Sequence, residues 1–510
     1  SRLARILLRS KDEENMNEDY DVIVVGAGNA AMCAAMSAHE QGAKVVILER
    51  APEDEAGGNS RYTAGAMRFA HNGLQDIATL VDLTDEEIET SDFGTYTTDQ
   101  YYDDMFRVTQ YRTDPQLCET LVTQSLETAQ WMRSKGMRFM PMYNRQAFKV
   151  DGKMKFWGGL VLEYWGGGHG IWEMQSKIAA DLGIPVLFEH RAIELIYDHE
   201  RVRGVKVKHQ GKVQEMFAKS VVLAAGGFES NSDWRTRYLG PGWDLVKVRG
   251  TRHNMGEGIK MALDIGAMPY GNWSGCHAVG WDLNAPEFGD LSVGDNFQKH
   301  SYPLGLIINA EGKRFVDEGA DFRNYTYAKY GREILSQPGQ FAWQIFDSKV
   351  LPLLRDEYRI RRMTKVQANT LEELVTKLEG VDAEQALRTL KEYNAAVQTD
   401  VRFNPAVLDG RGTKGLEVPK SNWANVLDEA PYEAYAITCG VTFTFGGLRI
   451  DEHGGVVDTD MQAIPGLYAA GELVGGLFYF NYAGGTGLMS GAVFGRQAGK
   501  SAAMAAQMAS

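Results

Sequence analysis

Apolar and polar positions occur in short blocks at the start of the chain, and these blocks predict a strand, a helix and a second strand. Residues 22–25 are consecutive apolar side chains, a pattern typical of a strand buried on both faces of a parallel sheet. Small side chains then dominate until Gly42, which ends the predicted helix. Residues 44–48 form the second predicted strand. The pattern therefore predicts one β-α-β unit over residues 21–50.

The turn of this unit has the spacing G-x-G-x-x-A, formed by Gly26, Gly28 and Ala31. The first glycine permits a tight turn, the second lets the backbone approach a pyrophosphate, and the small third residue lets the helix pack closely on its strand. Glu49 ends the second strand, where its carboxylate could accept ribose hydroxyls. The unit predicts a bound dinucleotide, with NAD and FAD both open; a glycine turn in an ordinary α/β domain is the alternative.

Further periodic stretches follow. Residues 113–136 predict a helix with Asp114 as a cap candidate, and residues 193–218 alternate as in a hairpin or meander. Residues 166–170 (GGGHG) precede a helical pattern, but no strand is predicted before them, so they are a poor candidate for a second dinucleotide fingerprint. Residues 369–380 predict a helix that begins with Asn369 as its cap.

Two later strands also run into glycines. Residues 220–223 lead into Ala225 and Gly226, and residues 467–470 lead into Gly471 and Glu472. The second arrangement would place a carboxylate and backbone amides beside a long polyol chain. A nicotinamide protein closes its cofactor site within one domain, whereas here the cofactor-like elements lie at both ends of the chain. This distribution favours FAD.

Composition narrows the class of protein. A chain of 510 residues predicts two or three domains, and its 44% hydrophobic content is that of a globular protein. The net charge of -14 argues against sequence-independent binding to nucleic acid or anionic lipid. The four cysteines include no C-x-x-C pair, so neither a metal site nor a disulfide framework is indicated, and a cytoplasmic location fits best. No apolar run is long enough to span a membrane.

Three motifs extend the picture: GGNSRYTAGAMRF at 57–69, GKRFVDEGADFRNYTYAKYGRE at 312–333 and CGVTFTFGGL at 439–448. Through them the chain resembles the flavoprotein subunits of fumarate reductases and succinate dehydrogenases over about residues 20–505. Within that family the match is to the tricarballylate dehydrogenase group. The resemblance implies an α/β fold, with a Rossmann-like FAD-binding domain of the glutathione-reductase type and an inserted α+β capping domain. The implied division is a mobile arm (1–18), the N-terminal segment of the FAD-binding domain (19–270), the capping domain (271–430) and the C-terminal segment of the FAD-binding domain (431–510).

The resemblance also assigns roles in catalysis. Arg323 corresponds to the family's proton-transfer arginine. The alternative roles for this residue are a substrate clamp or a surface ion pair. His277 corresponds to a histidine that touches a substrate carboxylate, although a lone histidine is as often structural. Tyr482 stands where the family has an arginine that clamps a dicarboxylate, and Thr442 and Phe443 replace a second substrate histidine.

These departures make simple succinate or fumarate an unexpected substrate. Tyr482 could still hydrogen-bond a carboxylate or carbonyl, and charge could come from elsewhere in the chain. Candidates for that charge are Arg249, Arg252, Lys299 and His300. The family's proton relay is also unmatched, with Gln298 and Ser301 near its places, so the route of protons to Arg323 is left open. Gly485, in the glycine loop before the last helix, is a further predicted substrate contact.

The resemblance, together with the glycine motifs, predicts the residues that hold FAD. Asn59 occupies the place where relatives in membrane complexes carry a flavin-linked histidine, which predicts non-covalent FAD. The helix that begins after residue 484 would point its N-terminal dipole at the flavin. The predicted cofactor residues are Gly26, Gly28, Asn29, Ala30, Glu49, Arg50, Gly58, Asn59, Ser60, Gly65, Ala225, Gly226, Gly471, Glu472, Gly487 and Leu488.

Three functions remain open from the sequence. The first is an FAD-dependent dehydrogenase or reductase acting on a carbon–carbon bond next to a carboxylate, with tricarballylate and cis-aconitate as the pair. The second is the same chemistry on another unsaturated acid or an enone. The third is a flavin electron-transfer subunit without its own substrate. No second nucleotide fold for a nicotinamide is predicted, so we expect a separate electron-transfer protein or small carrier as partner, which for this group implies a possible position peripheral to a membrane.

Overall fold

The fold is built on a parallel sheet whose strands come from both ends of the chain. A computed structural model describes residues 20–509; the predicted arm at 1–18 lies outside the described residues. Strand β1 (Tyr20–Val25) lies between β2 (Val45–Leu48) and β12 (Lys212–Leu223), and β22 (Ala463–Ala469) pairs with β12 on its other side. These pairings are parallel, and β9 (Val186–Leu187) continues the sheet beyond β2. The predicted β-α-β unit and the second glycine-ended strands therefore share one sheet.

The carboxyl ends of these strands meet at one edge of the sheet. Val25 and Leu48 end β1 and β2, Ala224 and Ala470 directly follow β12 and β22, and all four line the same cavity. Ligands of open α/β sheets bind outside the carboxyl ends of the strands. The sheet topology thus brings the N-terminal and C-terminal glycine motifs together.

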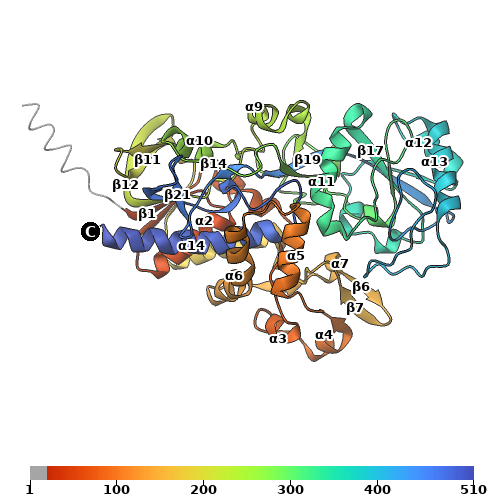
Figure 1. Cartoon of the computed structure of the whole chain (residues 1–510), viewed down its shortest axis with the longest axis horizontal. Helices are drawn as coiled ribbons and strands as arrows, with labels where there is room; N and C mark the ends of the chain where they lie inside the picture. Colours follow the sequence, from red (N-terminus) through yellow and green to blue (C-terminus); the bar gives the residue numbers. More distant parts are fainter. Residues whose placement is uncertain (1–19, 510) are drawn as a thin grey trace, which may run out of the picture.

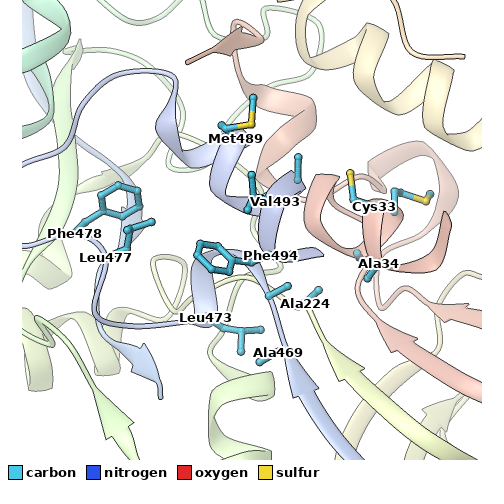
Figure 2. Close-up of a cluster of buried hydrophobic side chains, with 14 of the residues drawn as sticks. Cys33, Ala34, Ala224, Ala469, Leu473, Leu477, Phe478, Met489, Val493 and Phe494 are labelled. Carbon is cyan, nitrogen blue, oxygen red and sulfur yellow. The ribbon is translucent and has the colours of Figure 1, made fainter. Parts of the chain in front are cut away.

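Two helices with small side chains pack on this sheet. Helix α2 (Asn29–Glu40) follows the first turn, and helix α14 (Thr486–Met508) ends the chain. They lie side by side, with α14 crossing the dinucleotide-binding region of the molecule (Figure 1). Val493 and Phe494 of α14 lie in a buried cluster with Cys33 and Ala34 of α2 (Figure 2). The prediction of a C-terminal helix after the glycine loop is confirmed.

The contact between these helices depends on glycine. A Cβ atom on Gly499 would lie 2.1 Å from the Ala34 carbonyl oxygen, and one on Gly495 would lie 2.5 Å from the Ala30 carbonyl oxygen. Real Cβ atoms do not approach backbone so closely, because such overlap costs several times the dispersion energy of a contact. The two backbones can therefore meet only where no side chain separates them.

An antiparallel meander leaves the parallel sheet on one side. Strand β10 (Arg191–Tyr197) pairs with β11 (Val202–His209), which pairs with the first half of β12. The predicted meander is confirmed, with its turn at residues 198–201. A small sheet of β3 (Ala66–Met67), β8 (Leu162–Tyr164) and β5 (Phe139–Pro141) lies nearby.

Two local predictions need correction. A short strand, β8, does precede residues 166–170, and helix α8 (Gly167–Asp181) follows them. Three residues of strand leave too weak a pattern to detect. The glycines serve packing, because a Cβ on Gly168 would lie 2.2 Å from the Arg61 carbonyl oxygen. The cap of α12 (Leu371–Lys377) is Thr370, whose hydroxyl accepts the Glu373 N–H, and not Asn369.

A helical lobe lies below α14 in Figure 1. Its longest member, α6 (Pro115–Ser134), confirms the helix predicted over 113–136, and the Asp114 side chain caps it by accepting the N–H groups of Gln116 and Leu117. The other helices of the lobe are α3 (Leu74–Ile77), α4 (Asp85–Thr90), α5 (Thr98–Val108) and α7 (Tyr143–Gln146). Its strands β4 (Ser91–Asp92), β7 (Lys153–Phe156) and β6 (Ala147–Val150) form a separate sheet.

The capping region is built on a second sheet. Its long central strand, β19 (Tyr432–Thr444), pairs with each of four neighbours. These are β13 (Lys247–Val248), β15 (Cys276–Asp282), β17 (Phe341–Phe346) and β18 (Lys365–Ala368), while β16 (Leu306–Ile308) continues the sheet beyond β17. Strand β19 begins after residue 430 and β13 ends before residue 271, so this sheet extends across both predicted domain boundaries.

Helices complete the cap. Helix α11 (Tyr327–Leu335) packs on β15, and α12 and α13 (Ala383–Ala396) bury their apolar faces in a separate hydrophobic cluster. Figure 1 shows the cap at the opposite end of the molecule from the C-terminus. The predicted α/β fold with a Rossmann-like domain and an inserted cap is confirmed.

Within residues 20–509, no helix combines the length and the hydropathy needed to cross a bilayer. The same residues contain no group of three or more histidine, cysteine or carboxylate side chains placed to hold a metal ion. The four cysteines are buried and unpaired.

We expect Gly499→Ala to lower the free energy of unfolding by about 1–3 kcal/mol, the usual cost of overpacking. Alanine favours an isolated helix by about 1 kcal/mol over glycine, so a loss of stability would isolate the effect of the contact with Ala34. The measurement is thermal and denaturant unfolding, with the exposed neighbour Lys500→Ala as a control. A Gly499→Ala protein as stable as the unmodified one would contradict the packing argument.

Candidate active site

A cavity of about 250 Å³ extends from the edge of the parallel sheet to the cap. It is lined by the first turn, the loop at 57–65, the start of α14 and residues of the cap. Every site residue predicted from the sequence lines it. These are Gly26, Gly28, Asn29, Ala30, Glu49, Arg50, Gly58, Asn59, Ser60, Gly65, Ala225, Gly226, His277, Arg323, Thr442, Phe443, Gly471, Glu472, Tyr482, Gly485, Gly487 and Leu488.

The first turn has the geometry that its sequence predicts. Gly26 has φ 113°, and a Cβ there would lie 2.2 Å from the Ala224 carbonyl oxygen, so only glycine fits. The N-cap residue of α2, Gly28, has no side chain, and Ser60 Oγ from the neighbouring loop accepts one N–H group of the helix end, that of Asn29, at 3.0 Å. The remaining N–H groups and the positive end of the helix dipole favour a phosphate at this point.

The loop at 57–65 lies against this turn. A Cβ on Gly58 would lie 3.5 Å from Gly28 Cα, so two glycine backbones face each other across the end of α2. The loop therefore forms part of the cavity wall.

Glu49 lies buried at the end of β2. Its carboxylate accepts the Ala51 N–H at 3.0 Å, and burial raises its pKa above the usual range. Arg50 is paired with Glu257 at 3.1 Å, so its charge is compensated at the cavity edge. A buried carboxylate at the end of the second strand is the ribose contact expected for an adenosine dinucleotide.

A carboxylate pair lies at the other end of the glycine cradle. The carboxylate of Glu472 lies beside that of the buried Glu229, and burial together with the charge of Glu229 raises the pKa of Glu472 well above its usual range. This shift favours the protonated form of Glu472. Asn254 donates to Glu229 Oε1, which fixes that carboxylate. A Cβ on Gly227 would lie 2.1 Å from Glu472 Oε2.

Asn59 connects this pair to the cap. Its Nδ2 donates to Glu229 Oε1 and to the Thr442 carbonyl oxygen, both at 2.7 Å, and its Oδ1 accepts the Thr251 N–H at 2.9 Å. The whole amide is thus engaged in hydrogen bonds. Asn59 is a positioning group that holds the loop, the carboxylate pair and strand β19 together.

These features fit a large dinucleotide. The N-terminus of α2, the buried carboxylate of Glu49 and the glycine cradle from Gly226 to Gly227 are the elements that such a cofactor requires. The opposing N-terminus of α14 begins at Gly485, whose φ is 82°. Tyr482 is the group that caps it, because its hydroxyl oxygen accepts the Gly487 N–H at 2.7 Å.

Aromatic rings form the cap end of the cavity. The His277 ring centroid lies 4.7 Å from that of Tyr482, 5.2 Å from that of Phe443 and 4.9 Å from that of Tyr327. His277 and Phe443 are paired residues of β15 and β19, which explains their contact. Tyr327 was not among the sequence predictions, because it is one of several tyrosines in its motif and none carries a distinguishing local signal.

The histidines of this region are neutral. Burial and the charge of Arg249 lower the pKa of His277 well below its usual range, and the same causes, with Arg323 added, lower that of His300. Among the described residues, both ring nitrogens of His300 lack a hydrogen-bond partner, and so does Nδ1 of His277. These rings can donate or accept hydrogen bonds to a ligand, but they contribute no charge at neutral pH. The suggestion that His300 supplies charge is therefore wrong.

Arg323 begins a short turn in the cap, and its guanidinium is buried. Nη2 donates to Gln146 Oε1 and to the Arg145 carbonyl oxygen at 3.3 Å, and the guanidinium lies 5.3 Å from the Trp157 ring centroid. No carboxylate within residues 20–509 forms an ion pair with it. Burial, followed by repulsion from Arg355, lowers its pKa to about 9. The alternative of a surface ion pair is excluded.

The other suggested cations differ in position. Arg249 lines the cavity, but Asp295 accepts from it at 2.6 and 2.9 Å, so its charge is compensated. Arg252 is exposed and paired with Glu55 at 2.8 Å. Lys299 donates to three backbone carbonyl groups, and burial lowers its pKa to about 8. Of these three, only Arg249 reaches the cavity.

Gln298 and Ser301 do not form a proton relay with each other. Gln298 Oε1 accepts from Arg249 at 3.3 Å, and Ser301 Oγ accepts the Arg355 N–H at 3.1 Å. Arg355, which also lines the cavity, was missed because it lies in a loop without a recognisable motif. Only the fold places it beside Arg323.

Comparison with known proteins agrees with this geometry. The model of the FAD binding domain family matches residues 21–488. A fumarate reductase (cytochrome) of Shewanella frigidimarina is 29% identical over 96% of this chain and 77% of its own length. The NADH:fumarate oxidoreductase of Klebsiella pneumoniae is 28% identical over 99% of this chain, which spans about half (51%) of that relative.

Solved structures have the same fold. The open conformation of a flavocytochrome c3 fumarate reductase matches with a TM-score of 0.71 and 26% identity, covering 98% of this chain and 81% of that one. A 3-ketosteroid dehydrogenase from Sterolibacterium denitrificans gives 0.72 at 20% identity, covering 95% and 99%, which supports the fold alone. The expected family is confirmed, while the tricarballylate group remains a prediction. The chain belongs to the FAD-binding family that includes the flavoproteins of fumarate reductases and succinate dehydrogenases.

Proposed function

We propose that the chain is an FAD-dependent oxidoreductase acting on a carbon–carbon bond next to a carboxylate, and that its substrate pair is tricarballylate and cis-aconitate. The observation that carries the proposal is Arg323. It is a buried guanidinium without a carboxylate partner, with a pKa lowered to about 9, and it lines the same cavity as the dinucleotide motif. Such a group can exchange a proton at the carbon next to the one that exchanges hydride.

FAD is the cofactor of this family, and when bound it supplies the hydride acceptor or donor. The adenosine half would be held by the N-terminus of α2 and by Glu49. The other half would lie between Asn59, Glu472 and the N-terminus of α14. The helix dipole there favours negative charge, which stabilises a reduced flavin.

The cap residues would orient and protonate the substrate. His277, His300 and Tyr327 offer neutral hydrogen bonds, while Arg323 holds the proton on its guanidinium. Because these side chains are buried, water is largely excluded and each charge interaction at the site is strengthened. Tyr482 uses its oxygen to accept the Gly487 N–H, which leaves its own proton free to donate to a substrate oxygen.

A second candidate is oxidation or reduction of another unsaturated acid or an enone. The observation in its favour is the ring cluster of Phe443, Phe478 and Tyr482, where an aromatic or alicyclic substrate would find apolar contacts and the Tyr482 hydroxyl could polarise a carbonyl. Similar proteins include a urocanate reductase of Eggerthella lenta and a 3-oxosteroid 1-dehydrogenase of Mycolicibacterium smegmatis.

The electron-transfer role without a substrate is the third candidate. In either enzymatic case, a separate electron-transfer protein or small carrier would exchange electrons with the flavin. The same proposal includes a cytoplasmic location. There the protein could also lie at the membrane surface, bound to a membrane electron-transfer partner. The relatives that exceed this chain in length include the fumarate reductase (cytochrome) and the NADH:fumarate oxidoreductase.

Anaerobic titration of the holoenzyme tests the substrate. We expect tricarballylate to bleach the flavin absorbance, since a dehydrogenase transfers hydride from its substrate to the cofactor. Bleaching by an enone-forming ketone or another saturated acid, but not by tricarballylate, would favour the second candidate. Absence of bleaching with the whole panel, together with absent reoxidation of reduced enzyme by the corresponding unsaturated compounds, would leave the electron-transfer role.

The pH dependence tests Arg323. Reduction of a double bond needs the protonated guanidinium, so its rate should fall as the pH rises through about 9. Dehydrogenation needs a proton acceptor, so its rate should rise over the same interval. Arg323→Ala should lower both rates by about 10²–10⁴-fold and remove the inflection. Lys391→Ala, exposed on the cap, serves as the control; an unchanged profile in Arg323→Ala would exclude this arginine as the proton-transfer group.

The flavin attachment follows from Asn59. An amide engaged in three hydrogen bonds is not a nucleophile, and none of the four cysteines lines the cavity. We expect acid precipitation to release all of the FAD into the supernatant, measured by its fluorescence. Flavin fluorescence that stays with the denatured polypeptide would show a covalent bond and exclude this proposal.

A further inference from the structure

A second, smaller cavity of about 40 Å³ lies beyond Arg323. Arg323, His300 and Arg355 line both this chamber and the large cavity, so these three side chains separate the two. The chamber lies between the cap and the helical lobe, which contributes Arg145 and Trp157. No residue of the dinucleotide motif reaches it. The chamber therefore adjoins the substrate end of the large cavity and not its cofactor end.

Polar atoms in the wall of this chamber lack partners. Arg355 Nη1, Arg145 Nη1, Trp157 Nε1 and both ring nitrogens of His300 are buried, and none has a hydrogen bond to any residue in 20–509. A buried donor without an acceptor costs about 1–3 kcal/mol, so such atoms are rare in folded proteins unless a ligand or water completes them. Several of them around one small chamber indicate a ligand that accepts hydrogen bonds.

The charges around the chamber are also unbalanced. Arg355 Nε lies 3.4 Å from Glu357 Oε1, but the two atoms make no hydrogen bond, and Arg145 Nε lies 3.9 Å from Glu163 Oε2. Arg323 adds a third guanidinium without a carboxylate. Three guanidinium groups thus lie near only two carboxylates, and neither carboxylate is within hydrogen-bonding contact of its arginine. Because arginine keeps its charge more firmly than any other side chain, the chamber has an excess of positive charge.

We propose that Arg355, Arg145 and His300 form a second anion subsite, which binds a carboxylate of the substrate remote from the bond that reacts. This inference rests on the proposed function and sharpens its substrate class to acids with two or more carboxylates. The guanidiniums supply charge and forked donors for a carboxylate, and neutral His300 supplies one N–H. Tyr482 replaces an arginine that would pair with a substrate carboxylate. Arg355 and Arg145 would then supply that ion pair from the opposite side of Arg323.

The alternative is that Arg355 and Glu357 pass protons to Arg323. The two roles predict different measurements. A subsite changes the affinity for acids in proportion to their number of carboxylates, whereas a proton path changes the rate of turnover for every substrate and leaves affinity unchanged.

The experiment uses one carbon skeleton with increasing charge. Butanoate, glutarate and tricarballylate are propane with one, two and three carboxylates. Their dissociation constants for the oxidised holoenzyme are measured anaerobically by calorimetry, and flavin reduction is followed separately. The variants are Arg355→Gln in the cap and Arg145→Gln in the opposite wall; the control is Arg388→Gln, an exposed cap arginine paired with Glu384 at 3.6 Å. FAD content and circular dichroism verify folding.

We expect Arg355→Gln and Arg145→Gln each to weaken binding of glutarate and tricarballylate by about 10–100-fold, the range for a charged hydrogen bond, with less than about twofold change for butanoate. Arg388→Gln should change none. If Arg355→Gln does not fold, Arg145→Gln alone decides. Equal weakening of all three acids, or slower turnover with unchanged affinities, would overturn the subsite.

The outcomes also separate the subsite from the proposed function. If the binding series follows charge but no acid reduces the flavin, the subsite stands and the proposed reaction fails. If tricarballylate reduces the flavin and neither variant discriminates among the acids, the reaction stands and the subsite fails.

Discussion

The direct contact between the backbones of α2 and α14 is the constraint on which the site depends. Glycine on one helix lies against carbonyl groups of the other, and this brings both helix N-termini to one cavity. Asn29 joins them, because its Nδ2 donates to the Leu488 carbonyl oxygen at 2.8 Å although the two residues are 459 positions apart. Its Oδ1 also accepts from Gln175 at 2.7 Å. The two ends of a dinucleotide site are thereby set by packing before any ligand is present.

The cofactor half could be predicted from the sequence because its signals are local. The turn from Gly26 to Ala31 and the acid at Glu49 lie within one β-α-β unit, so spacing alone predicts their geometry. The cap half could be predicted only in part, through the motifs that contain His277 and Arg323. Arg355, Tyr327 and Arg145 come from a loop, a helix and a separate lobe, and only the fold brings them together. The cap of α12 was misplaced by one residue because Asn369 and Thr370 have similar capping tendencies.

Burial determines which cap residues carry charge. The chain is strongly acidic, yet Arg249, Arg323 and Arg355 converge where the cavity meets the cap. Desolvation makes His277 and His300 neutral, and it lowers the pKa of Arg323 without removing its proton at pH 7. Positive charge at this end therefore comes from guanidinium groups, while the imidazoles act as neutral hydrogen-bonding surfaces. Burial and the charge of Glu229 likewise raise the pKa of Glu472, which favours its protonated form.

Strand β19 has a consequence for how such proteins diverge. It is the central strand of the cap sheet, and its last residues, Thr442 to Thr444, line the cofactor cavity. An exchange of the cap between relatives that cut the chain at 270 and 430 would leave this strand behind. Strands β15, β17 and β18 would lose their pairing with β19, and only β16 and β17 would stay paired. The smallest unit that keeps the sheet intact runs from β13 to the end of β19, residues 247–444. Recombination would therefore transfer a portion of the cofactor wall together with the substrate pocket, so the two would be inherited as one module.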